Sequence, residues 1–211
     1  MGSGDVFRLL RISFSETKYS LPSPAIFIDR DGVINCRRAG DYVLNWSQFS
    51  FTPGIREALS ELAKLRLPMI VISNQACVGK GLLTIFGLQD ITTRMYEILV
   101  AGGILIAAAY YCIHRVEDNC SCRKPKPALL YSAAFDYNID LNRSVFIGDS
   151  DTDMQAGLAA GCTPVLFGST HVRSSDHLGL PKRIAPAETA DALYGITVGQ
   201  LKDCGGLKPS G

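Results

Sequence analysis

Short apolar runs alternate with amphipathic segments along most of the chain. Apolar runs occupy 25–28, 69–72, 104–111, 145–147 and 164–167. Between them apolar residues recur every three or four positions, which is the spacing of a helix with one buried face. This pattern predicts helices over about 53–65, 88–101, 127–137 and 151–160. Strands alternating with helices in this way predict an α/β fold, a doubly wound parallel sheet covered on both faces.

The two ends of the chain lack this alternation. Residues 1–24 read as a polar N-terminal extension, and the segment 168–211 is richer in glycine, proline and serine, with a weak helical signal around 187–201. We therefore expect one domain over 25–167, flanked by the extension and by a peripheral C-terminal tail.

Composition and charge narrow the class of protein. Hydrophobic residues make up 47% of the 211 residues, and the formal net charge is +1, which argues against a disordered chain and against a broad phosphate-backbone binder. The longest apolar run, 101–113, is shorter than the roughly 20 residues that span a bilayer. With no signal-like stretch in 1–20, we expect a cytoplasmic protein, a monomer that binds a small molecule and has neither nucleic acid nor membrane as a partner.

Acidic and polar side chains follow three of the expected strands. Asp29 and Asp31 come directly after the first run, and Ser73 and Asn74 close the second. Asp149 follows the fourth, with Asp151 and Asp153 close behind it as further oxygen ligands. Because the carboxyl ends of parallel strands share one edge, these groups are expected to converge there. Paired carboxylates need a cation or a shared proton, and Mg²⁺ suits oxygen ligands beside a phosphate. The alternative is that the aspartates only cap a turn at a solvated strand end.

Three of the seven cysteines crowd together with a histidine. Cys112 and His114 alternate, as do Cys120 and Cys122, so each pair can point to one side of an extended chain. Three thiolates and one imidazole form a closed tetrahedral Zn²⁺ site with no position for a reacting water, so we expect a small structural zinc loop over 112–122. Chance grouping of reduced cysteines is the alternative.

Several motifs, in this order along the chain, resemble the haloacid dehalogenase superfamily. They are DRDGVIN at 29–35, SNQ at 73–75, CIH at 112–114, CSCRKPKP at 120–127 and GD at 148–149. Within that superfamily the motifs are similar to the zinc-containing phosphatases of D-glycero-D-manno-heptose 1,7-bisphosphate and of histidinol phosphate. The resemblance covers 25–167 and implies a Rossmann-like fold and a Mg²⁺-dependent phosphomonoesterase.

The resemblance also implies a role for each matching residue. Asp29 attacks phosphorus and carries an aspartyl-phosphate, and Asp31 exchanges the proton with the leaving group and with water. Ser73 and Lys124 hold the phosphoryl oxygens, while Asp29, Asp149 and the backbone carbonyl of Asp31 hold Mg²⁺. The residues expected to contact the substrate are Asn74, Arg123, Asp41, Tyr42, Lys80 and Ser150.

The chain departs from the heptose bisphosphate branch at four positions. That branch typically has Thr, Ser, Arg and Lys where this chain has Ser73, Ala76, Lys80 and Ser150. The heptose bisphosphate remains the first expectation because 41–43 and 124–127 resemble that branch, and histidinol phosphate or another small metabolite is the second. A zinc-loop binding module on an inactive fold is the alternative from a different class.

Overall fold

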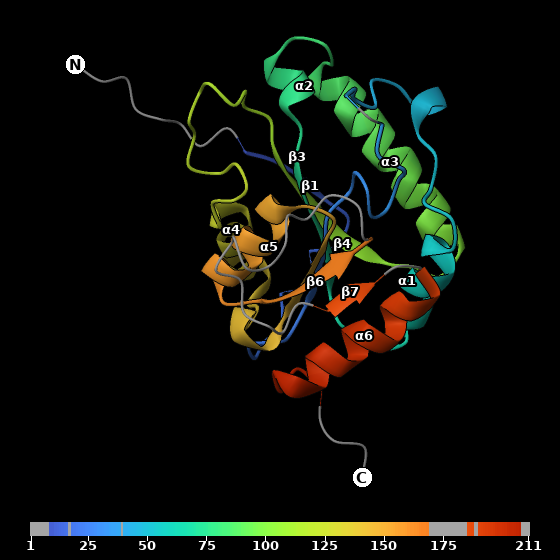
Figure 1. The fold of residues 1–211 in the computed structure, drawn as a ribbon, viewed down its shortest axis with the longest axis vertical. Coiled ribbons are helices and arrows are strands. Elements are labelled where there is room, and N and C mark those ends of the chain that lie inside the picture. The colour runs from blue at the N-terminus through green and yellow to red at the C-terminus, as the bar shows by residue number, and fades with distance from the viewer. Residues whose placement is uncertain (1–8, 17, 39, 169–184, 188–189, 208–211) are drawn as a thin grey trace, which may run out of the picture.

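In the described part of the chain, seven strands form one sheet (Figure 1). The computed structural model describes residues 9–16, 18–38, 40–168, 185–187 and 190–207. The strands, in chain order, are β1 (Leu9–Ser13), β2 (Ile26–Ile28), β3 (Met69–Asn74), β4 (Ile106–Cys112), β5 (Val145–Gly148), β6 (Thr163–Phe167) and β7 (Ala185–Ala187). The helices are α1 (Ile55–Ala63), α2 (Ala76–Gly79), α3 (Ile85–Ala101), α4 (Ala128–Tyr137), α5 (Asp151–Ala160) and α6 (Ala190–Asp203), with short 3₁₀ turns η1 (Trp46–Gln48) and η2 (Leu141–Arg143).

The strand order is β1-β4-β3-β2-β5-β6-β7. The chain moves outward from β2 through β3 to β4, then returns to the other side of β2 for β5, β6 and β7, all of them parallel. Such a reversal leaves a crevice beyond the carboxyl ends of the central strands. The predicted α/β sheet is therefore confirmed, and its reversal lies at β2, from which Asp29 follows.

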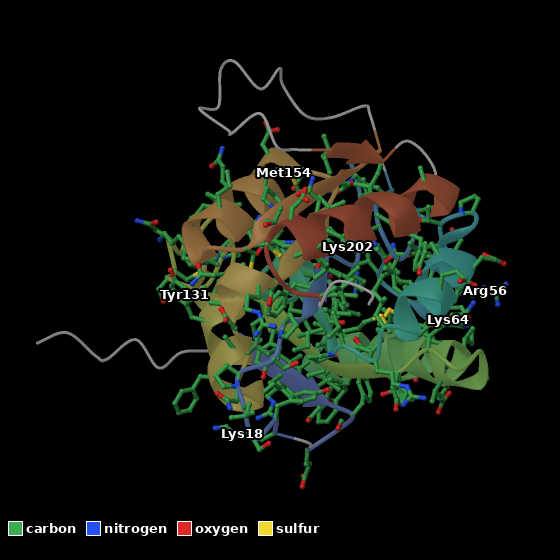
Figure 2. The ribbon with its side chains drawn as sticks, turned by 90° about the horizontal axis from the view of Figure 1, so that it is seen from below. Lys18, Arg56, Lys64, Tyr131, Met154 and Lys202 are labelled. Carbon is green, nitrogen blue, oxygen red and sulfur yellow. The ribbon has the colours of Figure 1, made fainter. Side chains whose placement is uncertain are left out.

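Helices cover both faces of the sheet, and each face has its own core. Ile26 and Ile28 of β2 belong to the cluster covered by α1, α3 and α6, whereas Phe27 belongs to the cluster covered by α4 and α5. Figure 1 shows these two sets of helices on opposite sides of the strands, and Figure 2 shows Tyr131 of α4 and Arg56 of α1 on opposite flanks. Because successive side chains of a strand point to opposite faces, continuous apolar runs are what a doubly covered sheet requires.

The sheet is mixed, because β1 pairs antiparallel with β4 at one edge. This strand lies in the segment that the sequence indicated only as a polar extension. Its register places Leu9 opposite Cys112 and Ser13 opposite Ala108. Leu10 and Ile12 pack against the core while Arg11 is exposed, so the short alternation was present but was interrupted by polar neighbours. Residues 1–8 and 17 of this extension lie outside the described part of the chain.

The C-terminal segment contributes to the core. Leu193 and Leu201 of α6 are fully buried, and α6 packs against α1. β7 adds a parallel strand beside β6. The described part of the segment expected to be a peripheral tail thus covers one face of the sheet, while 169–184, 188–189 and 208–211 lie outside the described residues.

Element boundaries match the expectation or differ from it by at most three residues. The helix expected to begin after Thr52 begins at Ile55, because Gly54 adopts a left-handed φ of 74° that ends the preceding turn. β3 extends through Ser73 and Asn74, so these two residues end the strand. The four-residue helix α2, which the apolar pattern does not predict, follows it. Within the described residues, no helix has the length and apolar character needed to cross a lipid bilayer.

Candidate active site

A cleft at the carboxyl edge of the central strands brings the candidate residues together. It has a volume of ≈ 740 Å³ and is lined by residues of the segments that follow β2 and β5 and by the last two residues of β3. The candidates that line it are Asp29, Asp31, Asp41, Tyr42, Ser73, Asn74, Lys80, Arg123, Lys124 and Ser150. Asp149 adjoins the cleft through Arg37, which lines it.

A buried ion-pair triad occupies the floor of this cleft. Lys124 Nζ lies 2.9 Å from Asp29 Oδ1 and 2.6 Å from Asp153 Oδ1, and it donates to the carbonyl of Ile72 at 3.0 Å. Burial by itself lowers the pKa of Lys124, but the charges of Asp153 and Asp29 outweigh burial and raise it, so the side chain is an ammonium ion. The triad therefore holds a fixed positive charge beside the carboxylate that follows β2.

Asp29 is buried among other acids. Its carboxylate accepts the backbone N–H of Arg30 at 2.7 Å, which together with Lys124 fixes its orientation. Burial, followed by the negative charge of Asp153, raises the pKa of Asp29 to about 7 even though Lys124 opposes the shift. A positive charge added next to these acids would favour the ionised form.

Three carboxylates meet closely enough to hold one metal ion. One oxygen each from Asp29, Asp149 and Asp153 lie within 4.8 Å of one another, and all three residues are buried. Asp153, the third residue of α5, was expected as a further oxygen ligand behind Asp149, and the structure brings it into this group. The donor set consists of hard oxygens with an uncompensated negative charge, which fits Mg²⁺.

Asp31 is held by three neutralising or donating side chains. Arg30 donates to its carboxylate at 2.9 Å, Gln75 at 2.7 Å and Asn35 at 3.0 Å. Burial raises the pKa of Asp31, but the Arg30 charge and these hydrogen bonds outweigh burial and lower it. Asp31 is therefore ionised in this arrangement, which is the form that accepts a proton.

Ser73 and Asn74 end β3 beside the triad but are placed differently. Ser73 is 2% exposed, and its hydroxyl accepts a hydrogen bond from Gln75 at 3.2 Å at the cleft wall. The Asn74 amide donates to the carbonyl of Lys124 at 3.2 Å and accepts its N–H at 3.1 Å. Asn74 thereby fastens the Lys124 segment to β3.

The outer walls of the cleft carry the remaining candidates. Lys80 lies 5.4 Å from the ring of Tyr42, and Arg38 lies 3.4 Å from Asp41. Ser150 caps α5 by exchanging hydrogen bonds with Asp153, so it supports the acidic cluster.

Arg123 presents an unpaired donor at the cleft. Its Nη1 is buried and has no hydrogen-bond partner among the described residues. A buried guanidinium nitrogen without a partner is costly, and an anion in the cleft would satisfy it.

The cysteine and histidine side chains form one compact cluster. The Sγ–Sγ distances are 3.5 Å for Cys112–Cys120 and 3.7 Å for Cys122–Cys120, and His114 Nδ1 lies 3.3 Å from Cys122 Sγ and 3.7 Å from Cys112 Sγ. A tetrahedron with Zn–S of about 2.3 Å and Zn–N of about 2.0 Å has edges of roughly 3.5–3.8 Å. A hydrogen bond from Cys122, aided by His114 and Cys120, lowers the pKa of Cys112 to about 5, so the cluster already favours a thiolate. The four donors therefore fit a zinc ion.

Comparison with known proteins agrees with this geometry. A family model described as HAD-hydrolase-like matches residues 121–196. A D-glycero-beta-D-manno-heptose-1,7-bisphosphate 7-phosphatase from Helicobacter pylori strain J99 is 40% identical over 137 residues, covering 64% of this chain and 78% of that protein. The chain belongs to the haloacid dehalogenase-like phosphatases. The resemblance found in the motifs is thereby confirmed.

Two further relatives of this phosphatase are also named for a heptose 1,7-bisphosphate. A D-glycero-alpha-D-manno-heptose-1,7-bisphosphate 7-phosphatase from Mycobacterium tuberculosis strain H37Rv is 35% identical over 149 residues, covering 68% of this chain and 78% of that protein. A solved D,D-heptose 1,7-bisphosphate phosphatase from B. bronchiseptica, complexed with magnesium and phosphate, has a TM-score of 0.75 and 29% identity, covering 85% of this chain and 99% of that chain. The first relatives are thus named for both anomers of one sugar bisphosphate.

Proposed function

We propose that this phosphatase removes the 7-phosphate of D-glycero-D-manno-heptose 1,7-bisphosphate in a Mg²⁺-dependent reaction through an aspartyl-phosphate. The observation that carries the reaction type is the buried triad of Lys124, Asp29 and Asp153 in a cleft that further arginine and lysine side chains also line. Phosphoryl transfer depends mainly on positioning and on neutralising charge, and the triad offers both beside a carboxylate of fixed orientation.

In the proposed reaction Asp29 and Asp31 divide the chemistry. A carboxylate oxygen of Asp29 forms a bond to phosphorus while the bond from phosphorus to the sugar oxygen breaks, and Asp31 donates its proton to that oxygen. Water then attacks the aspartyl-phosphate and gives a proton to Asp31, which releases phosphate and restores Asp29. Ser73 and Lys124 hold the phosphoryl oxygens during both steps.

The proton step makes a specific demand on Asp31. Its pKa is lowered by Arg30 and by the hydrogen bonds from Gln75 and Asn35, so the acid form is scarce in this arrangement. As a proton acceptor in the second step Asp31 is well placed, whereas in the first step it must loosen its contact with Arg30 to carry a proton. The Arg30 contact therefore tunes the balance between the two steps.

Two metal ions belong to the proposal. Asp29, Asp149, Asp153 and the backbone carbonyl of Asp31 would hold Mg²⁺, which supplies positive charge for the phosphoryl oxygens. The zinc cluster would be structural, since its four protein ligands close the coordination shell. Its place in the chain, directly before Arg123 and Lys124, supports a role in holding these two side chains at the cleft.

The names of the relatives and the unpaired Arg123 nitrogen support a substrate with a second phosphate. Arg37, Arg38 and Lys80 line the same cleft. A phosphate that does not react needs such donors, and binding energy from the remote end appears in kcat/KM. Histidinol phosphate lacks a second anionic group and stays the weaker candidate.

The test is a steady-state assay of both heptose bisphosphate anomers, the heptose 7-phosphate and histidinol phosphate under identical Mg²⁺. We expect the bisphosphate to exceed the 7-phosphate in kcat/KM by at least tenfold, about 1.4 kcal/mol. Equal values for the two sugars, or a preference for histidinol phosphate, would remove the substrate assignment and leave the phosphatase chemistry standing.

A further inference from the structure

Arg37 forms a two-point ion pair with Asp149, one of the residues that are proposed to bind the metal. Its Nε donates to Asp149 Oδ2 at 2.8 Å and its Nη2 donates to Asp149 Oδ1 at 2.6 Å, so both oxygens of the carboxylate are engaged. The same Nη2 lies 3.5 Å from the backbone carbonyl of Asp31. The guanidinium therefore contacts two of the groups assigned to Mg²⁺, one of them 112 residues away in the sequence.

The negative charge of the three carboxylates is too small to balance Lys124, a divalent cation and Arg37 together. Asp29, Asp149 and Asp153 carry three negative charges when ionised, and Lys124 supplies one positive charge. A divalent cation neutralises the remaining two, whereas Mg²⁺ together with the Arg37 guanidinium leaves an excess positive charge. Burial amplifies such an imbalance, because like charges repel more strongly where water is excluded.

The geometry leads to the same exclusion. Mg²⁺ binds oxygen at about 2.0–2.1 Å and demands regular octahedral positions. The Arg37 guanidinium engages both oxygens of Asp149, and it interacts electrostatically with Asp29 and Asp153 as well. The metal and the guanidinium are therefore alternatives at Asp149.

Arg37 is far more exposed to solvent than Lys124. The Arg37 side chain is 43% exposed, and its segment has neither helix nor strand where it is described. Lys124, by contrast, is 3% exposed and is fixed by two carboxylates and a backbone carbonyl. Once released, the guanidinium remains tethered to the cleft that Arg38 and Lys80 also line.

We propose that Arg37 holds the place of the divalent cation at Asp149 and, once the cation displaces it, binds the phosphate of the substrate that does not react. The second half rests on the proposed function. Metal binding would in this way expose a binding group for the substrate, so that the two ligands favour each other. An arginine suits both sites, because its planar fork binds a carboxylate and a phosphate equally well.

The first test measures Mg²⁺ alone binding to the substrate-free, zinc-loaded protein by calorimetry. In Arg37→Ala the metal no longer competes with a guanidinium, and we expect its affinity to rise on the order of tenfold. Arg38→Ala is the matched control. It removes the same charge from the neighbouring position, and Arg38 pairs with Asp41 and not with Asp149. An unchanged affinity in Arg37→Ala, or an equal rise in Arg38→Ala, would overturn the exchange.

The second test compares kcat/KM for the heptose bisphosphate and the heptose 7-phosphate at saturating Mg²⁺. Arg37→Ala should lower the preference for the bisphosphate by about fivefold or more. An unchanged preference overturns the role of Arg37 as a phosphate anchor. A wild-type protein with no preference at all overturns the proposed substrate instead, and the calorimetric result does not depend on it.

Discussion

The crowding of acids around Asp29 predicts that removing its charge stabilises the metal-free protein. The change is Asp29→Asn, which keeps the shape of the side chain and leaves Asp153 to pair with Lys124. In the wild-type protein, burial and the negative charge of Asp153 raise the pKa of Asp29 from an ordinary 3.8 to about 7. Full ionisation of such a group lowers the free energy of unfolding by about 4 kcal/mol.

The sign and the pH window follow from the direction of the shift. Because the folded protein holds the proton more tightly than the unfolded chain, stability from the protonated form is complete below about pH 4 and is lost as the pH rises through about 7. Asparagine carries no charge at any pH, so the variant does not lose stability in this way as the pH rises. The advantage of Asp29→Asn should therefore grow by roughly 2–3 kcal/mol between pH 5 and pH 8.

The assay is urea denaturation of both proteins at these two pH values, in buffer without added divalent cations. Asp90→Asn is the matched control, because Asp90 is an exposed acid of α3 that pairs with Arg94. With Mg²⁺ present the advantage should shrink, and turnover by Asp29→Asn should fall below about a hundredth of wild type, about 2.7 kcal/mol in barrier. A difference that is flat with pH, or a variant less stable than wild type at pH 8, would refute the crowding argument.

Three further predictions concern the zinc loop, the metal site and the remote phosphate. Protein purified without added zinc should contain close to one equivalent by elemental analysis, and Cys120→Ser should lose it together with stability; active, folded wild-type protein free of zinc would contradict this. Gly32→Ala should weaken Mg²⁺ binding at least tenfold by calorimetry, about 1.4 kcal/mol, because φ is +97° and the new Cβ would overlap the Asp149 carboxylate. Gly40→Ala is its control, since φ is +71° and the new Cβ meets no atom within 4 Å, so equal losses in both would assign the effect to backbone strain. Arg123→Ala should lower kcat/KM for the bisphosphate at least tenfold relative to the 7-phosphate in the steady-state assay, about 1.4 kcal/mol, and an equal loss on both sugars would place Arg123 at the reacting phosphate instead.

Local pattern was sufficient for the central sheet and for much of the cleft. Strands that are buried on both faces need continuous apolar runs, so the runs at 25–28, 69–72 and 145–147 predicted β2, β3 and β5. Parallel strands bring their carboxyl ends to one edge, so Asp29 and Ser73 could be expected at the same place before any contact was known. The alternation of Cys112 with His114 and of Cys120 with Cys122 likewise indicated that the two side chains of each pair point to the same side.

Pairing between distant segments was decided only by the tertiary structure. Leu10 and Ile12 alternate with polar residues as in an edge strand. The local sequence, however, does not indicate that β1 pairs with β4 or that the pairing is antiparallel. Likewise, the weak amphipathic signal of α6 did not indicate that Leu201 would be fully buried.

The same limit applies to the electrostatics of the site. The sequence by itself determined which residue types stand at the strand ends, and therefore the class of chemistry. That Lys124 bridges Asp29 to Asp153, and that Arg37 engages Asp149, depends on how loops of irregular backbone return to the cleft. Hydrophobic periodicity encodes which face of an element is buried, whereas charge pairs across a cleft depend on distances between segments far apart in the chain, which only the folded arrangement defines.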